Sequence, residues 1–70
     1  MDDNGIKDNL TFEEALVWLK NHHAIAREAW GDWSDLILAN GDIMHRADTS
    51  FLIWSATSED LLACDWKVWI

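Results

Sequence analysis

The sequence contains a single cysteine, Cys64, and this scarcity excludes two of the usual supports of a very small domain. One cysteine cannot form an internal disulfide, and it is too few for a cysteine-based zinc site. Seventy residues form one domain whose core buries only a modest fraction of its surface. Oligomerisation is the remaining way to supplement such a core. We interpret Cys64 as a buried thiol in a reducing cytosol.

Basic residues are also scarce. Five Lys and Arg stand against thirteen Asp and Glu, which gives a formal net charge of −8. A phosphate backbone would meet an acidic surface, so we expect no nucleic-acid partner, and anionic membranes are disfavoured for the same reason. The acidic balance is typical of a solvated surface, and it would also steer a basic partner towards the chain.

Long apolar runs are missing as well. No run approaches the length that crosses a bilayer, so we expect no contact with a membrane. The first residues are acidic and polar, so we expect no secretion signal. Residues 1–10 show no periodicity and contain Gly5, which predicts a flexible N-terminal tail followed by a single domain over residues 11–70.

Two helices are predicted by capping signals. Thr11-Phe12-Glu13-Glu14 is a capping box, and the apolar residues after it recur at helical spacing. They predict a helix of roughly ten residues that ends at Asn21-His22-His23. Thr57 and Ser58 can both cap a second, short helix over about residues 59–63.

Between and after these helices the sequence predicts strands. Asn40-Gly41 is the strongest local signal, a two-residue hairpin turn between strands at residues 36–39 and 42–46. Trp30-Gly31-Asp32 is typical of a turn, and further strands are predicted at residues 24–28, 51–54 and 65–70. We therefore predict an α+β fold, with one N-terminal helix and a short C-terminal helix packed on an antiparallel sheet of about four or five strands.

Six tryptophans are too many to hide in one small core, so some should line an interface or a ligand pocket. Trp30 and Trp54 each lie at the end of a predicted strand, close to Asp32 or Ser55. Tryptophan faces can stack on nucleobases while an acid or hydroxyl binds the base edge or ribose. Arg27 could pair with a phosphate through two hydrogen bonds. The same rings could also pack in the core or at a dimer interface, and the sequence leaves both interpretations open.

The sequence shows no self-sufficient catalytic motif. Asp60 and Asp65 could form a general acid and base pair, but no nucleophile, phosphate loop or metal cluster accompanies them. His22-His23 could bind a metal together with His45, although adjacent histidines point in different directions, which favours a solvated pair at a helix end. We predict a protein that is not an enzyme and that uses no metal or cofactor.

Three segments of the chain carry recognisable patterns. They are Phe12-Glu13-Glu14-Ala15-Leu16, Ile25-Ala26-Arg27-Glu28-Ala29-Trp30 and Trp54-Ser55 to Ser58-Glu59-Asp60-Leu61-Leu62-Ala63-Cys64-Asp65-Trp66-Lys67-Val68. These segments resemble the F-x-E-A-L, R-x-G-W and W-x-x-S-x-x-D-L-L-A-x-D-W patterns of the phage Thoeris anti-defence 2 family. The match spans nearly all of residues 11–68, and its last pattern is the most specific. The chain differs from the family at Ala29, where glycine is usual, and at Gly31, where asparagine is common.

This resemblance implies a binding protein that acts as a sponge. Members of the family sequester cyclic nucleotide immune signals, notably glycocyclic ADP-ribose species, without degrading them, and some also hold cyclic oligonucleotides. They are homo-oligomers with the signal held between subunits. For this chain the resemblance implies a dimer or tetramer in the host cytoplasm. It also implies a ligand site at Arg27, Trp30, Trp54, Asp60 and Asp65, in which tryptophans stack on adenine, the arginine meets phosphate and the acids take ribose hydroxyls.

Two other functions remain open from the sequence. An acidic protein of this size could inhibit a host defence protein, such as a CRISPR or nuclease protein, by imitating the charge of nucleic acid. A hydrolase that uses Asp60 and Asp65 could instead act on the same cyclic nucleotide.

Overall fold

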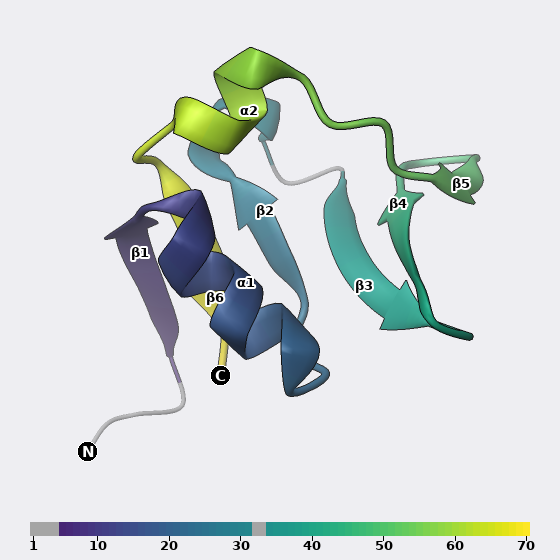
Figure 1. Ribbon diagram of the computed structural model, residues 1–70, viewed down its shortest axis with the longest axis horizontal. Coiled ribbons are helices and arrows are strands. Elements are labelled where there is room, and N and C mark those ends of the chain that lie inside the picture. The colour runs from purple at the N-terminus through teal and green to yellow at the C-terminus, as the bar shows by residue number, and fades with distance from the viewer. Residues whose placement is uncertain (1–4, 32–33) are drawn as a thin grey trace.

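The computed structural model describes residues 5–31 and 34–70, which form an antiparallel sheet of six strands with two α-helices. The strands are ordered β1-β6-β2-β3-β4-β5. Helix α1 lies over the β6 and β2 side of the sheet and adjoins α2, whereas β4 and β5 extend beyond it (Figure 1). The elements are β1 (Ile6–Leu10), α1 (Phe12–Lys20), β2 (Ile25–Arg27), the 3-10 turn η1 (Glu28–Trp30), β3 (Asp35–Ala39), β4 (Asp42–Arg46), β5 (Phe51–Ile53), α2 (Ser58–Leu62) and β6 (Trp66–Trp69).

Helix α1 begins at the predicted capping box. The Glu14 backbone N–H donates to Thr11 Oγ1 at 3.2 Å, and the Thr11 backbone N–H donates to Glu14 Oε1 at 2.9 Å. The two bonds satisfy amides that the first helical turn would otherwise leave without a partner. Ala15 and Leu19 lie four residues apart and are both buried against the sheet. The α+β class and both helices are therefore confirmed, and α2 begins after Thr57 as predicted.

The hairpin between β3 and β4 is also confirmed. Asn40 has φ 54° and Gly41 has φ 83°, so both turn residues adopt the left-handed conformation that a type I′ turn requires. This turn fixes the register, in which Ile37 lies opposite Met44. Because side chains alternate along a strand, the register also decides which residues face α1.

The first strand is a correction to the sequence prediction. Residues 1–10 were expected to form a tail, but Ile6–Leu10 form β1 and pair with β6, which raises the number of strands to six. The side chains of β1 do not alternate between apolar and polar, so the sequence carries no strand signal there. The pairing depends on the neighbouring strand, with Leu10 opposite Trp66. The rest of the predicted tail, residues 1–4, lies outside the described residues, as does Asp32 of the predicted turn.

The core lies between α1 and one face of the sheet. Its fully buried large side chains are Leu19 from α1 together with Ile25, Leu36, Trp66 and Val68 from three adjacent strands. Trp66 and Val68 alternate with Lys67 along β6, so they point towards the helix. Within the described residues, no helix has the length and apolar character needed to cross a membrane.

We expect Leu19→Ala to lower the free energy of unfolding by about 2–5 kcal/mol, because it removes a fully enclosed side chain and leaves a cavity. Leu62→Ala is the matched control, since it makes the same change on a helix at a side chain that is 81% exposed, against 1% for Leu19. The control should change stability by less than about 0.5 kcal/mol. Urea unfolding followed by tryptophan fluorescence measures both variants, and equal losses would contradict the described core.

Candidate functional site

The centre of the candidate site is the indole ring of Trp66. Its centroid lies 5.2 Å from Phe12, 5.3 Å from Trp30 and 6.0 Å from Trp54. Trp30 in turn packs on the ring of His45 at 5.1 Å. We call these five residues the aromatic cluster. Trp66 is fully buried, whereas Trp30 and Trp54 are only partly buried, so the cluster extends from the core to the surface.

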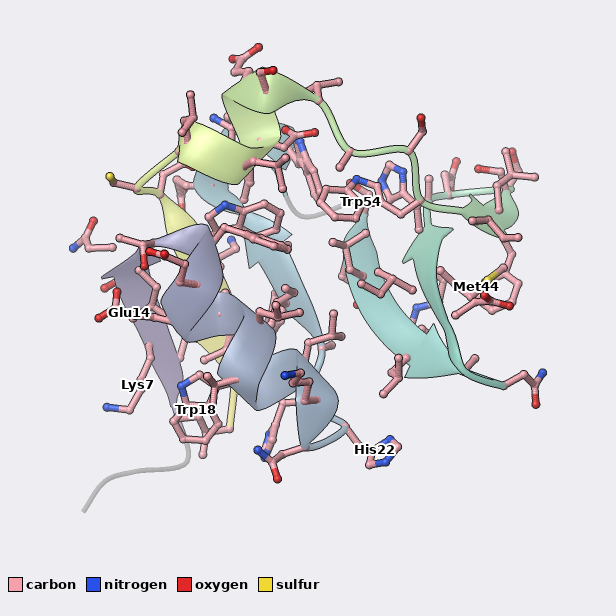
Figure 2. The ribbon with its side chains drawn as sticks, viewed as in Figure 1. Lys7, Glu14, Trp18, His22, Met44 and Trp54 are labelled. Atoms are coloured by element: carbon pink, nitrogen blue, oxygen red, sulfur yellow. The ribbon has the colours of Figure 1, made fainter. Side chains whose placement is uncertain are left out.

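Backbone hydrogen bonds and a short turn fix the positions of Trp30 and Trp54, the two tryptophans of the cluster that are partly exposed. Strand β2 ends in the 3-10 turn η1, and its first amide, that of Glu28, donates to the Asp65 carbonyl oxygen at 2.9 Å. Trp30 closes this turn, and Gly31 follows with φ 77°. Trp54 comes directly after β5, and its N–H donates to the Ile43 carbonyl oxygen at 2.9 Å. Its side chain lies at the junction between β5 and the segment that leads to α2 (Figure 2).

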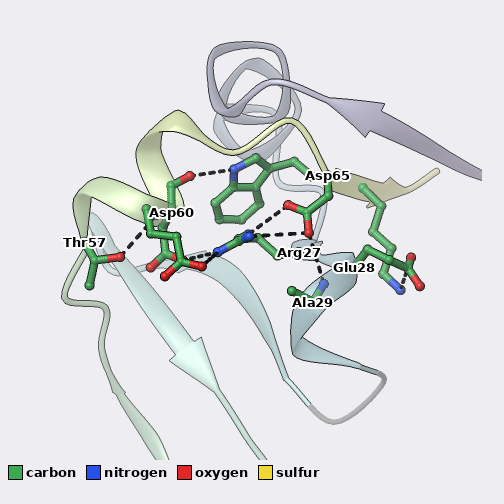
Figure 3. Close-up of polar contacts among 9 residues, drawn as sticks. Arg27, Glu28, Ala29, Thr57, Asp60 and Asp65 are labelled. Atoms are coloured by element: carbon green, nitrogen blue, oxygen red, sulfur yellow. Dashed lines mark hydrogen bonds and ion pairs between the residues drawn. The ribbon is translucent and has the colours of Figure 1, made fainter.

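A buried ion cluster adjoins the ring of Trp66. Arg27 Nε donates to Asp65 Oδ1 at 2.8 Å, and Arg27 Nη1 donates to Asp60 Oδ1 at 2.9 Å. Arg27 Nη2 lies 3.5 Å from Asp65 Oδ2, which also accepts the Ala29 backbone N–H at 3.1 Å. Figure 3 shows the guanidinium held between the two carboxylates. The cluster ties β2 to α2 and to the residue that precedes β6.

Asp60 joins this ion cluster to the aromatic cluster. Its backbone N–H donates to Thr57 Oγ1 at 3.2 Å, the cap that begins α2. Its carbonyl oxygen accepts the indole N–H of Trp66 at 2.9 Å. The cap of a five-residue helix therefore places both a carboxylate beside Arg27 and a carbonyl against the buried indole.

The ion pairs shift the pKa values of Arg27 and Asp65. The hydrogen bond from Arg27 holds the pKa of Asp65 below its ordinary value, with burial opposing the shift and the Ala29 amide adding to it. The bonds to Asp65 and then Asp60 raise the pKa of Arg27 against the effect of burial. One cation and two carboxylates leave the three residues with one net negative charge (+1 − 2 = −1).

The structure groups the five predicted site residues into two sets. Arg27, Asp60 and Asp65 bind one another, and Trp30 and Trp54 both pack on Trp66. A phosphate would have to displace a carboxylate to reach the buried face of Arg27, and both acids are already engaged. The role of all five in ligand binding stays a prediction.

Sequence reasoning missed three members of the aromatic cluster, Phe12, His45 and Trp66. Two of them carried usable signals: Phe12 shares helical spacing with the buried Ala15 and Leu19, and Trp66 lies on the helix-facing side of a strand. His45 gave no such signal. Cys64 is a further correction: it is exposed, since it lies in the short connection between α2 and β6.

The histidines have separate surroundings. His23 Nδ1 lies 3.2 Å from the Trp69 carbonyl oxygen, and its ring packs edge-on against Trp18. His45 Nε2 is buried and has no hydrogen-bond partner among the described residues. In the same part of the chain, no group of three or more His, Cys, Asp or Glu side chains could hold a metal ion.

The fold and the site define a small α+β domain that carries partly exposed tryptophans above a buried ion cluster. Residues 10–69 match the family model described as Tad2-like, the Thoeris anti-defense 2-like domain. The match covers nearly the whole 70-residue chain, so the chain belongs to this family. The family's description indicates a role against the Thoeris defence and names no reaction. No curated protein and no solved structure matches the chain significantly.

We expect Arg27→Met to destabilise the fold by about 3–5 kcal/mol, because it leaves the buried carboxylate of Asp60 and the partly buried carboxylate of Asp65 without their cation. Arg46→Met is the control. Arg46 also binds one aspartate through two hydrogen bonds, to Asp35 at 2.9 and 2.7 Å, but its side chain is 51% exposed, against 10% for Arg27. The control should cost about 0–1 kcal/mol. Thermal unfolding measures the stability of both variants. Equal losses of stability in Arg27→Met and Arg46→Met would show that burial does not govern the strength of these ion pairs.

The lowered pKa of Asp65 predicts that the fold loses stability in acid. The ionised form of Asp65 is favoured in the folded state. Its contribution to the free energy of unfolding is therefore complete above its ordinary pKa of 3.8, and it is lost as the pH falls through the lower pKa of the folded state. We expect Asp65→Asn to be less stable than the natural chain at neutral pH. The difference between the two should shrink as the pH falls below about 4. A difference that stays constant into acid would contradict the assignment.

Proposed function

We propose that this chain is a phage anti-defence sponge that binds a cyclic ADP-ribose or related cyclic nucleotide signal and holds it without degrading it. It acts as a homo-oligomer in the host cytoplasm. The proposal goes beyond the family's stated role against Thoeris by naming the ligand class and the mode of action. The observation that carries it is the family match over residues 10–69, together with two partly buried tryptophans at the surface end of the aromatic cluster.

The tryptophans support the proposal because stacking needs a flat ring held in place. Trp30 and Trp54 are each anchored on Trp66 and each retain some exposed surface. A nucleobase stacked on such a ring gains about 1–3 kcal/mol. A ring that is already fixed by packing loses little conformational freedom on binding. Rings from a second chain would cover the other side of the nucleotide.

The charge of the chain favours stacking over ion pairing as the main source of affinity. The chain carries a formal charge of −8, and Arg27 is neutralised by the two acids that it binds. At physiological ionic strength, exposed charges act over only about 8 Å, so the distant acids repel an anionic ligand weakly. In this proposal Arg27, Asp60 and Asp65 hold the backbone around Trp30 and Trp66, and direct contacts to phosphate or ribose add to the stacking.

Retention without turnover is supported by the state of the two acids. A general acid or base must reach the reacting group with a proton to give or a lone pair to accept one. Asp60 and Asp65 both direct oxygen atoms at Arg27, and the salt bridge favours the ionised form of Asp65. This arrangement suits structural acids better than a catalytic pair.

A capture-and-release experiment tests the proposal. The protein is mixed with a panel of glycocyclic ADP-ribose isomers and cyclic dinucleotides, removed by filtration, and then heated to release what it holds. We expect one class of ligand to be depleted in proportion to protein and recovered intact on heating. Ligands that stay in the filtrate would overturn the sponge and favour the acidic inhibitor of a host protein, whose complex should dissociate in high salt. Recovery of a cleaved product would indicate the hydrolase.

Single substitutions test the assigned rings. Trp30→Leu and Trp54→Leu keep apolar bulk but remove the flat face, so each should weaken capture by about 5- to 150-fold, the equivalent of one base stack. Trp18→Leu is the control. Trp18 lies near the C-terminal end of α1, away from Trp54, and packs on His23 (Figure 2). Unchanged capture by both folded variants, measured by equilibrium dialysis, would show that the ligand binds elsewhere.

A further inference from the structure

The ring of His45 covers part of the face of Trp30. The two ring centroids lie 5.1 Å apart, with an interplanar angle of 34°. Rings that lie edge to edge in one plane would clash at that separation, so the imidazole lies over the face of the indole. Trp66 meets Trp30 nearly at right angles, at 78°, which is an edge contact. Among the described aromatic residues, His45 is therefore the one that lies against Trp30 in the manner of a stacked base.

One nitrogen of this imidazole is enclosed without a hydrogen bond. His45 Nε2 is buried and has no partner among the described residues. A ring nitrogen of neutral histidine either donates or accepts a hydrogen bond, and enclosing it without a partner costs free energy in either tautomer. His23 differs, since its Nδ1 lies 3.2 Å from the Trp69 carbonyl oxygen. The position of His45 over Trp30 is thus stabilised by ring packing and opposed by the missing hydrogen bond.

The surroundings of His45 are closed on one side and open on the other. On β4, His45 lies directly opposite Leu36 of β3 and Leu52 of β5. Opposite residues share a face, so the three side chains stand in a row on the helix-facing side of the sheet. Leu36 is fully buried, whereas Leu52 is 66% exposed. A rotation of the imidazole towards β5 therefore carries Nε2 out to solvent.

We propose that His45 is an internal competitor for Trp30, and that a nucleobase binds there by taking the place of the imidazole on the indole face. The inference rests on the proposed function, because it says what fills the stacking site before the signal arrives. Imidazole is flat and is one of the two rings of a purine, so the exchange keeps the indole covered. The displaced ring turns towards Leu52, where Nε2 gains hydrogen bonds to water.

Two opposing contributions keep this exchange close to balance. The ring contact with Trp30 favours the covering position, and the enclosed nitrogen without a partner disfavours it by a comparable amount. A base therefore displaces His45 at little net cost in free energy. In the free protein the same ring reduces the apolar surface that Trp30 presents to other molecules.

Two substitutions at His45 separate this role from a ligand-holding or a purely structural one. His45→Phe keeps a ring on Trp30 and removes the enclosed nitrogen, so capture should weaken by about 2- to 12-fold, the strength of one aromatic pair. His45→Ala removes the competing ring, so it should capture at least as tightly as the natural chain. His23→Ala is the matched control, because His23 packs on Trp18 outside the aromatic cluster, and it should leave capture unchanged.

Equilibrium dialysis of the folded variants against a glycocyclic ADP-ribose measures capture. Adenosine is the probe if the natural chain captures no member of the panel. Weaker capture by His45→Ala would overturn the proposal, because it would show that His45 holds the ligand or supports the site. Equal capture by His45→Phe and the natural chain would overturn it as well, since the base would then stack elsewhere.

Proton NMR of the histidine rings follows the exchange directly. In the free protein, the ring current of Trp30 should shift the ring protons of His45 upfield, and Trp30→Leu should remove this shift. Adenosine at millimolar concentration, which carries a base without the rest of the signal, should remove it too. The ring protons of His23 should not change. His45 protons that keep their shift with adenosine and with every member of the panel would overturn the proposal.

The same spectra distinguish this proposal from the sponge. A panel that is not captured, together with an exchange that adenosine still causes, would overturn the sponge and leave the role of His45 standing. An intact ligand that is captured while His45 stays on Trp30 would do the reverse.

Discussion

The buried contact between Asp60, Arg27 and Trp66 holds this small domain together. Asp60 binds the guanidinium of Arg27 with its carboxylate at 2.9 Å and the indole N–H of Trp66 with its carbonyl oxygen at the same distance. One residue of α2 thus fixes a charge on β2 and the largest buried ring on β6. A buried cation without these partners would cost several kcal/mol, so the helix, the two strands and the ring around which Trp30 and Trp54 pack depend on one another.

This dependence explains how a 70-residue chain can hold aromatic side chains near its surface. Large rings that are not anchored would collapse together or promote aggregation. Here the buried ring of Trp66 provides a common surface, and hydrogen bonds of the backbone at Glu28 and Trp54 fix the segments that carry the outer rings. Family membership assigns the chain a role against the Thoeris defence. In our proposal, the anchored rings carry out that role by stacking on a cyclic nucleotide.

Local signals predicted the fold where structure depends on neighbours in sequence. The capping box at Thr11 and the turn at Asn40-Gly41 both rest on interactions within four residues, and both were confirmed. Strand β1 was missed because it depends on pairing with β6, at the other end of the chain. Its polar side chains show no alternation. Distant pairing of backbone groups leaves little trace in the sequence.

The candidate site was likewise predictable only in part. Sequence spacing and family patterns selected Arg27, Asp60 and Asp65, but they could not show that these residues bind one another. The acids lie 33 and 38 residues beyond the arginine, and the antiparallel pairing of β2 with β6, together with the position of α2, brings them to it. Burial of Arg27 and exposure of Cys64 were likewise unpredictable, because each depends on where α2 lies against the sheet.

Native mass spectrometry of the protein mixed with a cyclic ADP-ribose signal tests the central claim most directly. The account predicts an assembly of an even number of chains whose mass is increased by that of the whole, unaltered nucleotide, with no cleaved product in solution. An assembly that carries no nucleotide, in the presence of every member of the ligand panel, would contradict it.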